Sequence, residues 1–315
     1  NTPAFLGAIE HRPASGEATT LAAAYAFVAN QGDAWGVITD ALDRDLQDHL
    51  IPLDEREGDD DREAFGGFLT LGTLLGRRTA GLHNALATET DDPDFQIEPV
   101  TKVDLKAWSE EAVAETDAML KRLSHTKASL PEEAQGLVAR ILAGRTRLMA
   151  RLRKPAKMQP AGFRSRIHGD YHLGQVLVAQ DDVMIIDFEG EPRRTLSERR
   201  AKSSPLRDVA GMLRSFHYAA ETAVNRRLAA AGLVDAETAE RARRWYRTVS
   251  DDFLAGYRTH LVAGEGDAGP DLSSALLDLF VIQKAIYEIG YELSNRPDWV
   301  KIPLTGVADL IGESS

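Results

Sequence analysis

Two stretches of sequence decide how this chain is interpreted: Arg166-Ile-His-Gly-Asp-Tyr-His-Leu-Gly-Gln-Val-Leu177 and Ile185-Ile-Asp-Phe-Glu-Gly190. Within and between them, Val176–Val178 and Val183–Ile186 are runs with high β propensity, joined across a tight turn. The pattern predicts a small β-hairpin buried in the body of the protein. Asp170 precedes this hairpin and Asp187 follows its second strand.

Most of the remaining chain is predicted to be helical, because apolar residues recur at helical spacing. One helix begins near Trp35, and the others cover residues 64–87, 103–123, 129–153, 205–231, 235–262 and 272–295. Ser129-Leu-Pro-Glu132 has the order of a capping box and predicts the start of helix 129–153. Residues 5–10 and 21–28 predict a second hairpin, and residues 54–63 and 264–269 predict loops. The predicted fold class is therefore α+β.

The composition is that of an ordinary globular protein. The chain has 315 residues, 43% hydrophobic and 27% charged, which is enough for one large or two ordinary domains. Its net charge of −12 argues against a non-specific nucleic-acid binder, and the absence of cysteine excludes disulfides and thiolate metal sites. Neither a secretory signal nor a run of about 20 apolar residues is present. We expect a cytoplasmic protein with no nucleic-acid or membrane partner.

The order of motifs along the chain resembles the maltokinases, a branch of the aminoglycoside phosphotransferase group within the protein-kinase-like fold. The resemblance includes the kinase modules fused to bacterial trehalose synthases. Besides the two quoted stretches, it is carried by Ala26–Trp35, Ile186–Pro192, Ser204–Ser215 and Lys284–Pro297. Together these stretches extend the resemblance over nearly the whole chain. The wider kinase fold has asparagine where this chain has Gln175, and the maltokinase-like pattern has glutamine there.

The resemblance implies two regions: residues 1–30 as the remnant of an N-lobe with its hinge, and residues 31–315 as a mostly helical C-lobe. Phe27, Val28 and Ala29 of the hinge would present backbone groups to the adenine of ATP. A working kinase also needs a phosphate-covering loop and a strand lysine, and neither occurs before residue 30. We therefore expect an incomplete N-lobe, and a chain that folds but is a poor or inactive kinase by itself.

Four residues are candidates for the roles that a protein has in phosphoryl transfer. The reaction needs a carboxylate near the acceptor hydroxyl, cations on the phosphates, and oxygen ligands for those cations. Asp170, beside a glycine that allows close approach, is the candidate for the first role. Asp187 and Glu189 project to one side if the strand geometry continues, and Mg²⁺ prefers such oxygen ligands. Gln175 offers one more carbonyl oxygen.

The histidines of the motif have less specific roles. His168 is a candidate catalytic residue, although a hydrogen-bonding brace for the loop explains it better than an acid or a base. His172 is a candidate for substrate binding that could also reach the metal. Arg207 and Asp208 are expected to pair with each other or with the loop. A lone His-Gly-Asp is a common turn, so the catalytic interpretation depends on Asp187 following a buried strand.

Helix 284–296 is the candidate sugar site. Its polar and aromatic residues fall at helical spacing on one face: Lys284, Tyr287, Glu288, Tyr291, Glu292 and Asn295, with Arg296 next. Tyrosine rings can stack on a sugar ring, and the charged groups can bond its hydroxyls. An amphipathic surface helix with ordinary ion pairs is the alternative.

The resemblance implies that maltose is phosphorylated at its anomeric hydroxyl by ATP with Mg²⁺, giving maltose 1-phosphate. Glucosamine or another sugar is the alternative substrate, and trehalose synthase is a possible fused or associated partner. A different class of function is also open, in which the chain is a non-catalytic kinase-like module that docks trehalose synthase. The intact set of Asp170, Gln175, Asp187 and Glu189 argues against this second class.

Asp170→Asn is predicted to abolish transfer and leave the fold intact, because the two side chains are nearly isosteric but the amide cannot accept the proton. Asp187→Asn should instead weaken binding of Mg²⁺–nucleotide. Turnover and nucleotide titration in the longest natural form of the protein separate the two effects. A wild-type rate for Asp170→Asn would show that the catalytic assignment is wrong.

Overall fold

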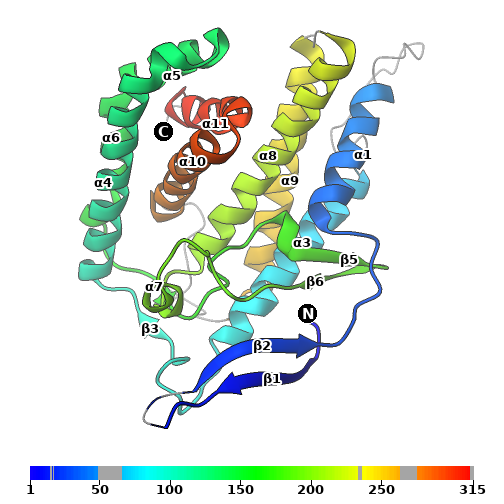
Figure 1. The fold of residues 1–315 in the computed structure, drawn as a ribbon, viewed down its shortest axis with the longest axis vertical. Coiled ribbons are helices and arrows are strands. Elements are labelled where there is room, and N and C mark those ends of the chain that lie inside the picture. Colours follow the sequence, from blue (N-terminus) through cyan, green and yellow to red (C-terminus); the bar gives the residue numbers. More distant parts are fainter. Residues whose placement is uncertain (15, 17, 49–65, 233–235, 263–274, 313–315) are drawn as a thin grey trace.

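The computed structural model describes residues 1–14, 16, 18–48, 66–232, 236–262 and 275–312 (Figure 1). The predicted loops at 54–63 and 264–269 lie outside these residues. The helices are α1 (Ala34–Asp48), α3 (Gly66–Leu86), α4 (Lys102–Thr126), α5 (Glu132–Ala143), α6 (Arg145–Arg153), α7 (Leu196–Arg200), α8 (Leu206–Ala231), α9 (Ala236–His260), α10 (Ala275–Asn295) and α11 (Lys301–Gly312). The strands pair antiparallel as β1 (Phe5–His11) with β2 (Thr19–Tyr25), β3 (Glu98–Pro99) with β4 (Phe163–Arg164), and β5 (Val176–Ala179) with β6 (Asp182–Ile185). The α+β class is confirmed.

Helix α8 lies in the middle of the helical body, where it packs against α1, α9 and α10 (Figure 1). Phe216 of α8 meets Trp245 and Phe253 of α9 edge-on, with ring centroids 6.4 and 5.6 Å apart. All three rings are buried. Burying a large apolar side chain contributes roughly 1.5–3 kcal/mol, so this cluster fixes α9 against α8. Among the described helices, none has both the length and the apolar character needed to cross a membrane.

Glycine lets α3 and α9 approach each other until their backbones touch. A Cβ atom on Gly76 of α3 would lie 2.1 Å from the Phe253 carbonyl oxygen, and one on Gly256 of α9 would lie 2.4 Å from the Thr73 carbonyl oxygen. Neither distance leaves room for a side chain, and the obstacle is backbone, which cannot rotate away. This contact brings polar residues of α3 and α9 close enough to bond one another.

The predicted buried hairpin is β5–β6, and its inward side chains Val176, Val178, Val183 and Ile185 are all buried. Residues before β1 and after β2 each bond to one edge of the β5–β6 hairpin. On one edge the amide of Ile185 donates to the carbonyl of Asn1 at 2.9 Å; on the other, the amide of Val178 donates to the carbonyl of Gly32 at 3.0 Å. The hairpin therefore joins the helical body to the N-terminal residues.

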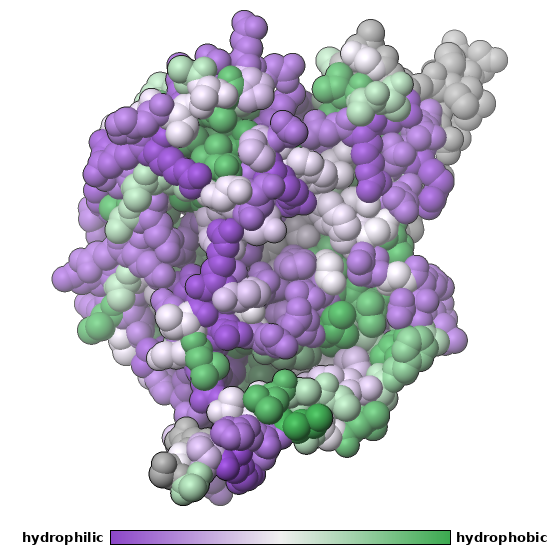
Figure 2. Space-filling view, in the orientation of Figure 1, coloured by the Kyte–Doolittle hydropathy of each residue, from purple (hydrophilic) through white to green (hydrophobic). Residues whose placement is uncertain are grey.

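Hairpin β1–β2 lies at the lower edge of the molecule in the view of Figure 1. Its strands are exposed along nearly their whole length. Figure 2 shows apolar surface in this region, and the exposed residues include Phe5, Leu6, Ile9, Leu21 and Tyr25. The predicted hairpin is confirmed. Its assignment to an incomplete N-lobe stays a prediction.

Several local predictions need correction. The single helix at 129–153 is two helices, α5 and α6, which meet at Gly144, where a Cβ would lie 2.5 Å from Ile311 of α11. Ser129 does not cap α5: Pro131 is the N-cap, and the Ser129 hydroxyl donates to the Thr126 carbonyl. Helices α7 and α11 and the β3–β4 pair were not predicted. These elements are short or depend on packing that periodicity does not show.

Gly76→Ala should destabilise the protein by roughly 1–3 kcal/mol or more, because the new methyl group meets backbone atoms of α9. Gly81→Ala is the matched control on the same helix, since a Cβ there meets nothing within 4 Å. The control should gain up to about 1 kcal/mol from helix propensity. Urea unfolding of the two variants measures the difference. Equal stabilities would contradict the close approach of α3 and α9.

Candidate active site

Asp170 lies in a loop, residues 166–172, whose backbone is held by a buried carboxylate of α8. Asp208 Oδ2 accepts a hydrogen bond from the amide of His168 at 2.7 Å, and Oδ1 accepts one from the amide of Gly169 at 2.9 Å. Gly169 has φ +83°, a left-handed conformation that glycine adopts without strain. The expected contact between Asp208 and the loop is confirmed.

Asp208 stays ionised although it is buried. Burial alone would raise the pKa of its carboxyl group, but the hydrogen bond from His83, electrostatic interaction with the His83 and His168 rings, and the amide of Gly169 together lower it. A buried carboxylate is tolerated only when it is fully hydrogen-bonded. The loop therefore rests on a fixed negative charge.

His168 braces the loop from the other side. Its Nε2 bonds the carbonyl of Ile186 at 2.9 Å, and its ring lies 5.0 Å from the ring of Phe188, between centroids. The amide of Asp170 faces its Nδ1 at 3.4 Å. These contacts tie the loop to the segment that follows β6. They occupy both ring nitrogens, which agrees with a bracing role for His168 better than with proton transfer.

The Asp170 carboxylate faces an open cleft of about 640 Å³ and has a lysine and a histidine as neighbours. Lys284 Nζ of α10 lies 3.4 Å from Asp170 Oδ1, and His172 Nε2 lies 4.0 Å from Oδ2. Burial lowers the pKa of His172, despite the opposite effect of Asp170. Asp170 keeps 20% of its side chain exposed, so a ligand in the cleft can reach it.

The proposed metal ligands are only partly assembled. Gln175 Nε2 donates to Asp187 Oδ2 at 2.7 Å, so these two side chains lie together. Asp187 has φ +62°, which means that the strand ends before it and that the condition for Asp187 and Glu189 to point the same way is not met. The Glu189 side chain is exposed, and its carbonyl accepts from Arg199. In the described ranges no three His, Asp or Glu side chains form a metal-binding group.

The residues predicted to form a hinge, Phe27, Val28 and Ala29, lie between β2 and α1. Phe27 is 90% exposed, and the Val28 carbonyl accepts a hydrogen bond from the side chain of Asn30 at 2.8 Å. Ala29 is exposed as well. The amide of Gln31 then donates to Val178 of β5, which ties the end of the hinge to the buried hairpin. The backbone here is ordered against β5 while Phe27 and Ala29 face solvent.

The predicted sugar face of α10 is divided between two environments. Tyr287 lines the cleft beside Lys284, which lies 5.1 Å from the centre of its ring. Glu288 instead pairs with buried Arg214 of α8 at 2.7 Å. Glu292 is 1% exposed and bonds Arg296 and the hydroxyl of Tyr218. The glutamates are thus anchors between α8 and α10 and do not line the cleft.

Two further predicted residues lie beside the cleft rather than in its lining. Tyr291 is sandwiched by cations, with the guanidinium of Arg193 at 5.0 Å and that of Arg296 at 5.5 Å from its ring centre. Arg296 also stacks on Trp299 at 4.7 Å. Such cation–π contacts hold the end of α10 against the segment after Gly190.

Acidic residues of the cleft were missed by the sequence analysis. Glu191 is buried and, together with burial of the ring, its hydrogen bond raises the pKa of Tyr287. Glu111 and Glu115 line the opposite wall on α4. Arg207 pairs with Glu111 at 3.2 Å and bonds Gln283, so of the two expected alternatives the structure has contact of Asp208 with the loop and not the pairing of Arg207 with Asp208. The only feature of the sequence that could have indicated one of these acidic residues is the position of Glu191, two residues after Glu189.

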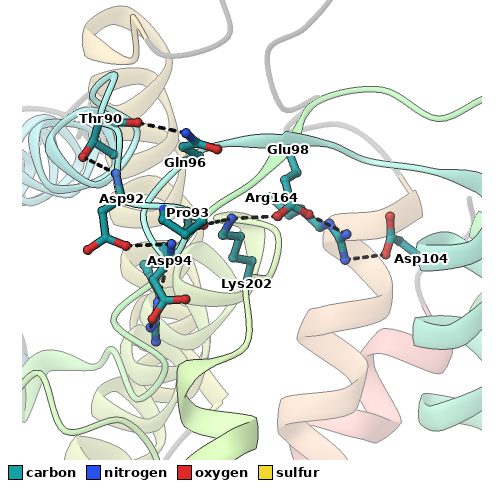
Figure 3. A network of polar contacts seen from close by, with 10 residues as sticks. Thr90, Asp92, Pro93, Asp94, Gln96, Glu98, Asp104, Arg164 and Lys202 are labelled. Atoms are coloured by element: carbon teal, nitrogen blue, oxygen red, sulfur yellow. Dashed lines mark hydrogen bonds and ion pairs between the residues drawn. The ribbon is translucent and has the colours of Figure 1, made fainter.

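A polar network anchors the start of the loop, as Figure 3 shows. Arg164 of β4 pairs with Glu98 at 2.6 Å and Asp104 at 2.9 Å. Lys202 bonds the same Glu98 and the carbonyl of Pro93, each at 2.6 Å. Backbone bonds between Ser165 and residue 203 continue the connection. The strand that leads into the loop is therefore fixed between the 92–98 segment and the residues before α8.

Glu288→Gln should destabilise the fold by about 3–5 kcal/mol, because it leaves the charge of Arg214 buried without a counter-ion. Glu240→Gln is the control: it removes the partner of exposed Arg243 and Arg247 and should cost about 1 kcal/mol or less. Thermal unfolding compares the two. A sugar-binding role for Glu288 predicts instead a loss of affinity at unchanged stability.

A family model shows the family of this chain, and curated relatives and solved structures are similar to it. Residues 8–248 match the model of the APH family, the phosphotransferase enzyme family. The glucosamine kinase of Streptacidiphilus jiangxiensis is 28% identical over 266 residues, which is 81% of this chain and 54% of that protein. That of Mycolicibacterium smegmatis is 27% identical over 257 residues, 81% of this chain and 57% of that protein. The chain spans about half the length of these curated relatives.

Solved structures show the same fold. A glucosamine kinase matches with a TM-score of 0.74 at 24% identity, covering 99% of this chain and 66% of that one. A glucosamine kinase in complex with glucosamine, ADP and inorganic phosphate matches with a TM-score of 0.72, covering 98% and 64%. At this sequence identity, the structural likeness shows the fold alone. The match over residues 8–248 goes further: the chain belongs to the phosphotransferase enzyme family.

Proposed function

We propose that this chain belongs to an ATP-dependent sugar kinase, in which Asp170 accepts the proton of the sugar hydroxyl. The observation that carries the proposal is the placement of Asp170. Its carboxylate faces a cleft within a braced loop, and Lys284 Nζ lies 3.4 Å from Oδ1. Sugar kinases among the relatives support the same class of reaction.

Different residues are assigned to the acceptor sugar and to the phosphates of ATP. Asp170 orients the attacking hydroxyl and takes its proton, and Lys284 stabilises the charge that develops beside it. Asp187 and Gln175, which lie together, would supply carboxylate and amide oxygens to Mg²⁺, and the ion would neutralise charge on the phosphates when bound. Glu189 remains a candidate ligand, and Phe27, Val28 and Ala29 remain candidates for contact with adenine. Use of ATP would place the reaction in the cytoplasm.

Two sugars are candidates for the acceptor. The motif order favours maltose, and with it an association with trehalose synthase. The relatives named glucosamine kinase favour an amino sugar, for which Glu111, Glu115 and Glu191 offer negative charge in the cleft. A volume of about 640 Å³ lies in the usual range of ligand pockets and accommodates either sugar. Of the predicted contacts, Tyr287 and His172 are the ones we retain for the sugar.

Sugar-dependent ADP release from the longest natural form of the protein tests the proposal, with maltose, glucosamine and glucose as acceptors. We expect turnover with maltose or glucosamine that is lost in Asp170→Asn. Turnover with glucosamine and none with maltose would reject the maltose assignment but keep the kinase. No Mg²⁺–nucleotide binding in a titration would instead favour the non-catalytic docking module.

A further inference from the structure

A groove lies on one side of the helical body, between α4 on one wall and α6 with the turn Pro155–Lys157 on the other. Helix α4 packs directly against both of these elements, as the left side of Figure 1 shows for α6. The groove has a volume of about 730 Å³, which is usual for a ligand pocket. Among the described residues, it shares none of its lining with the cleft of Asp170. Six of the residues that line this α4–α6 groove set its chemistry: Lys106, Ser109, Val113, Met149, Arg153 and Lys157.

The two walls of the α4–α6 groove run antiparallel, which gives the groove an ion-paired end and a cationic end. At the ion-paired end, Arg145 of α6 lies 2.6 Å from Asp117 of α4. Asp117 also pairs with Lys121 at 2.7 Å, so the charges at this end are satisfied within the protein. From this ion pair, α4 runs back to Lys106 and the other wall runs forward to Lys157. The two lysines therefore lie at the opposite end of the groove, one on each wall.

The cationic end has more positive charge than the protein neutralises. It holds Lys106, Arg153 and Lys157, all of them exposed. Lys106 has Glu110 at 3.8 Å, and because these side chains are 69% and 67% exposed, the pair contributes little. Within the ranges that the structure describes, Arg153 and Lys157 form no ion pair and no side-chain hydrogen bond. Three positive charges and one negative charge leave two positive charges at this end, on a chain whose net charge is −12.

Ser109 adds an unpaired hydroxyl group to the groove, one helical turn from Lys106. It is 2% exposed, it lines the groove, and its Oγ has no hydrogen-bond partner among the described residues. Hydroxyl groups inside helices often bond the carbonyl one turn earlier, as Thr39 and Thr79 do in this protein. A buried hydroxyl group without a partner is unfavourable, and a ligand that accepts its hydrogen bond removes that cost. Ser109 is thus a donor available to an occupant of the groove.

The middle of the α4–α6 groove is apolar. Val113 of α4 and Met149 of α6 line it, and Met149 is buried. Ala114 and Ala156 belong to the lining as well, and their small exposed side chains leave the groove open. A thioether beside a branched alkyl group offers a good surface to an aromatic ring, because sulfur contacts the edges of such rings favourably. The groove therefore suits a ligand with an anionic head and an apolar body.

We propose that the α4–α6 groove is a second binding site, which takes an organic phosphate: a phosphate monoester on an aromatic or aliphatic body. A phosphate monoester carries a charge of about −1.5 to −2 near pH 7, which matches the two uncompensated positive charges. Its oxygens accept hydrogen bonds from Arg153, Lys157 and Ser109. Its body lies on Val113 and Met149 and points towards the ion-paired end. This site is independent of the proposed kinase function, because its lining residues are separate from those of the cleft.

The methionine methyl groups provide a separate probe for each site. Met149 lines the α4–α6 groove and Met119 lines the Asp170 cleft, while Met212 is buried in α8 and lines neither. Phenyl phosphate is titrated into this chain with its methionine methyl groups labelled with carbon-13, and NMR follows their chemical shifts. We expect a saturable shift of the Met149 signal. The Met212 signal should stay in place and reports that the fold is unchanged in wild type and in each variant.

Variants of exposed residues separate the cationic end from general charge effects. Arg153→Gln and Lys157→Gln should each weaken the binding measured at Met149 about tenfold, the effect of one charge-assisted hydrogen bond. Lys154→Gln is the matched control: it removes the same charge between these two positions, but Lys154 does not line the groove. Its affinity should stay within about twofold of wild type, because salt screens exposed charges. Ser109→Ala should also weaken binding and leave stability unchanged, since its hydroxyl group has no protein partner to lose.

Two further probes test the two parts of the ligand. Benzoate has the ring without the phosphate, and inorganic phosphate has the charge without the ring, so each should bind about tenfold more weakly than phenyl phosphate. Equal affinity of benzoate would reject the phosphate head, and equal affinity of inorganic phosphate would reject the apolar body. The absence of a saturable Met149 shift would overturn the site, as would equal losses in Lys154→Gln and Arg153→Gln. A shift at Met119 alone would place phenyl phosphate in the cleft and overturn the second site.

Discussion

The buried carboxylate of Asp208 is the constraint on which the active-site region depends. An ionised group without solvent needs donors from every direction, and here they come from the loop backbone and from α3. The helices α3, α8 and α9 must therefore converge within hydrogen-bond distance of one point. The glycine contact between α3 and α9 and the aromatic cluster between α8 and α9 are the packing features that make this convergence possible.

Helix α10 has polar residues on two faces, one directed at α8 and one at the cleft. Glu288 and Glu292 bond Arg214 and Tyr218 of α8, and these buried contacts set the rotation of the helix about its axis. With that rotation fixed, Lys284 and Tyr287 face the cleft and Asp170. Polar residues of α10 that look alike in the sequence thus have different roles. Those facing α8 stabilise the fold, and those facing the cleft contribute to the site.

The cleft itself is a balance of charges rather than a basic or acidic pocket. Lys284 compensates Asp170, and Arg207 compensates Glu111 while its guanidinium stacks on Phe280 at 4.5 Å. Such paired groups can exchange partners when a polar ligand enters. The fold and family leave the identity of the ligand open, because relatives with one fold can differ in a few side chains of the lining.

The sequence by itself determined the α+β class, the buried hairpin at 176–186 and the loop that carries Asp170, because these follow from local periodicity and from motifs read within one segment. It also indicated that Asp208 would contact the loop. Only the tertiary structure decided which neighbour each helical face meets. Tyr287 and Glu288 are adjacent on one helix, yet Glu288 pairs with Arg214 and Tyr287 lines the cleft. Periodicity defines a face relative to the helix axis, whereas the identity of the facing element depends on contacts distant in sequence, such as Ile311 against Gly144 and Tyr257 against His83.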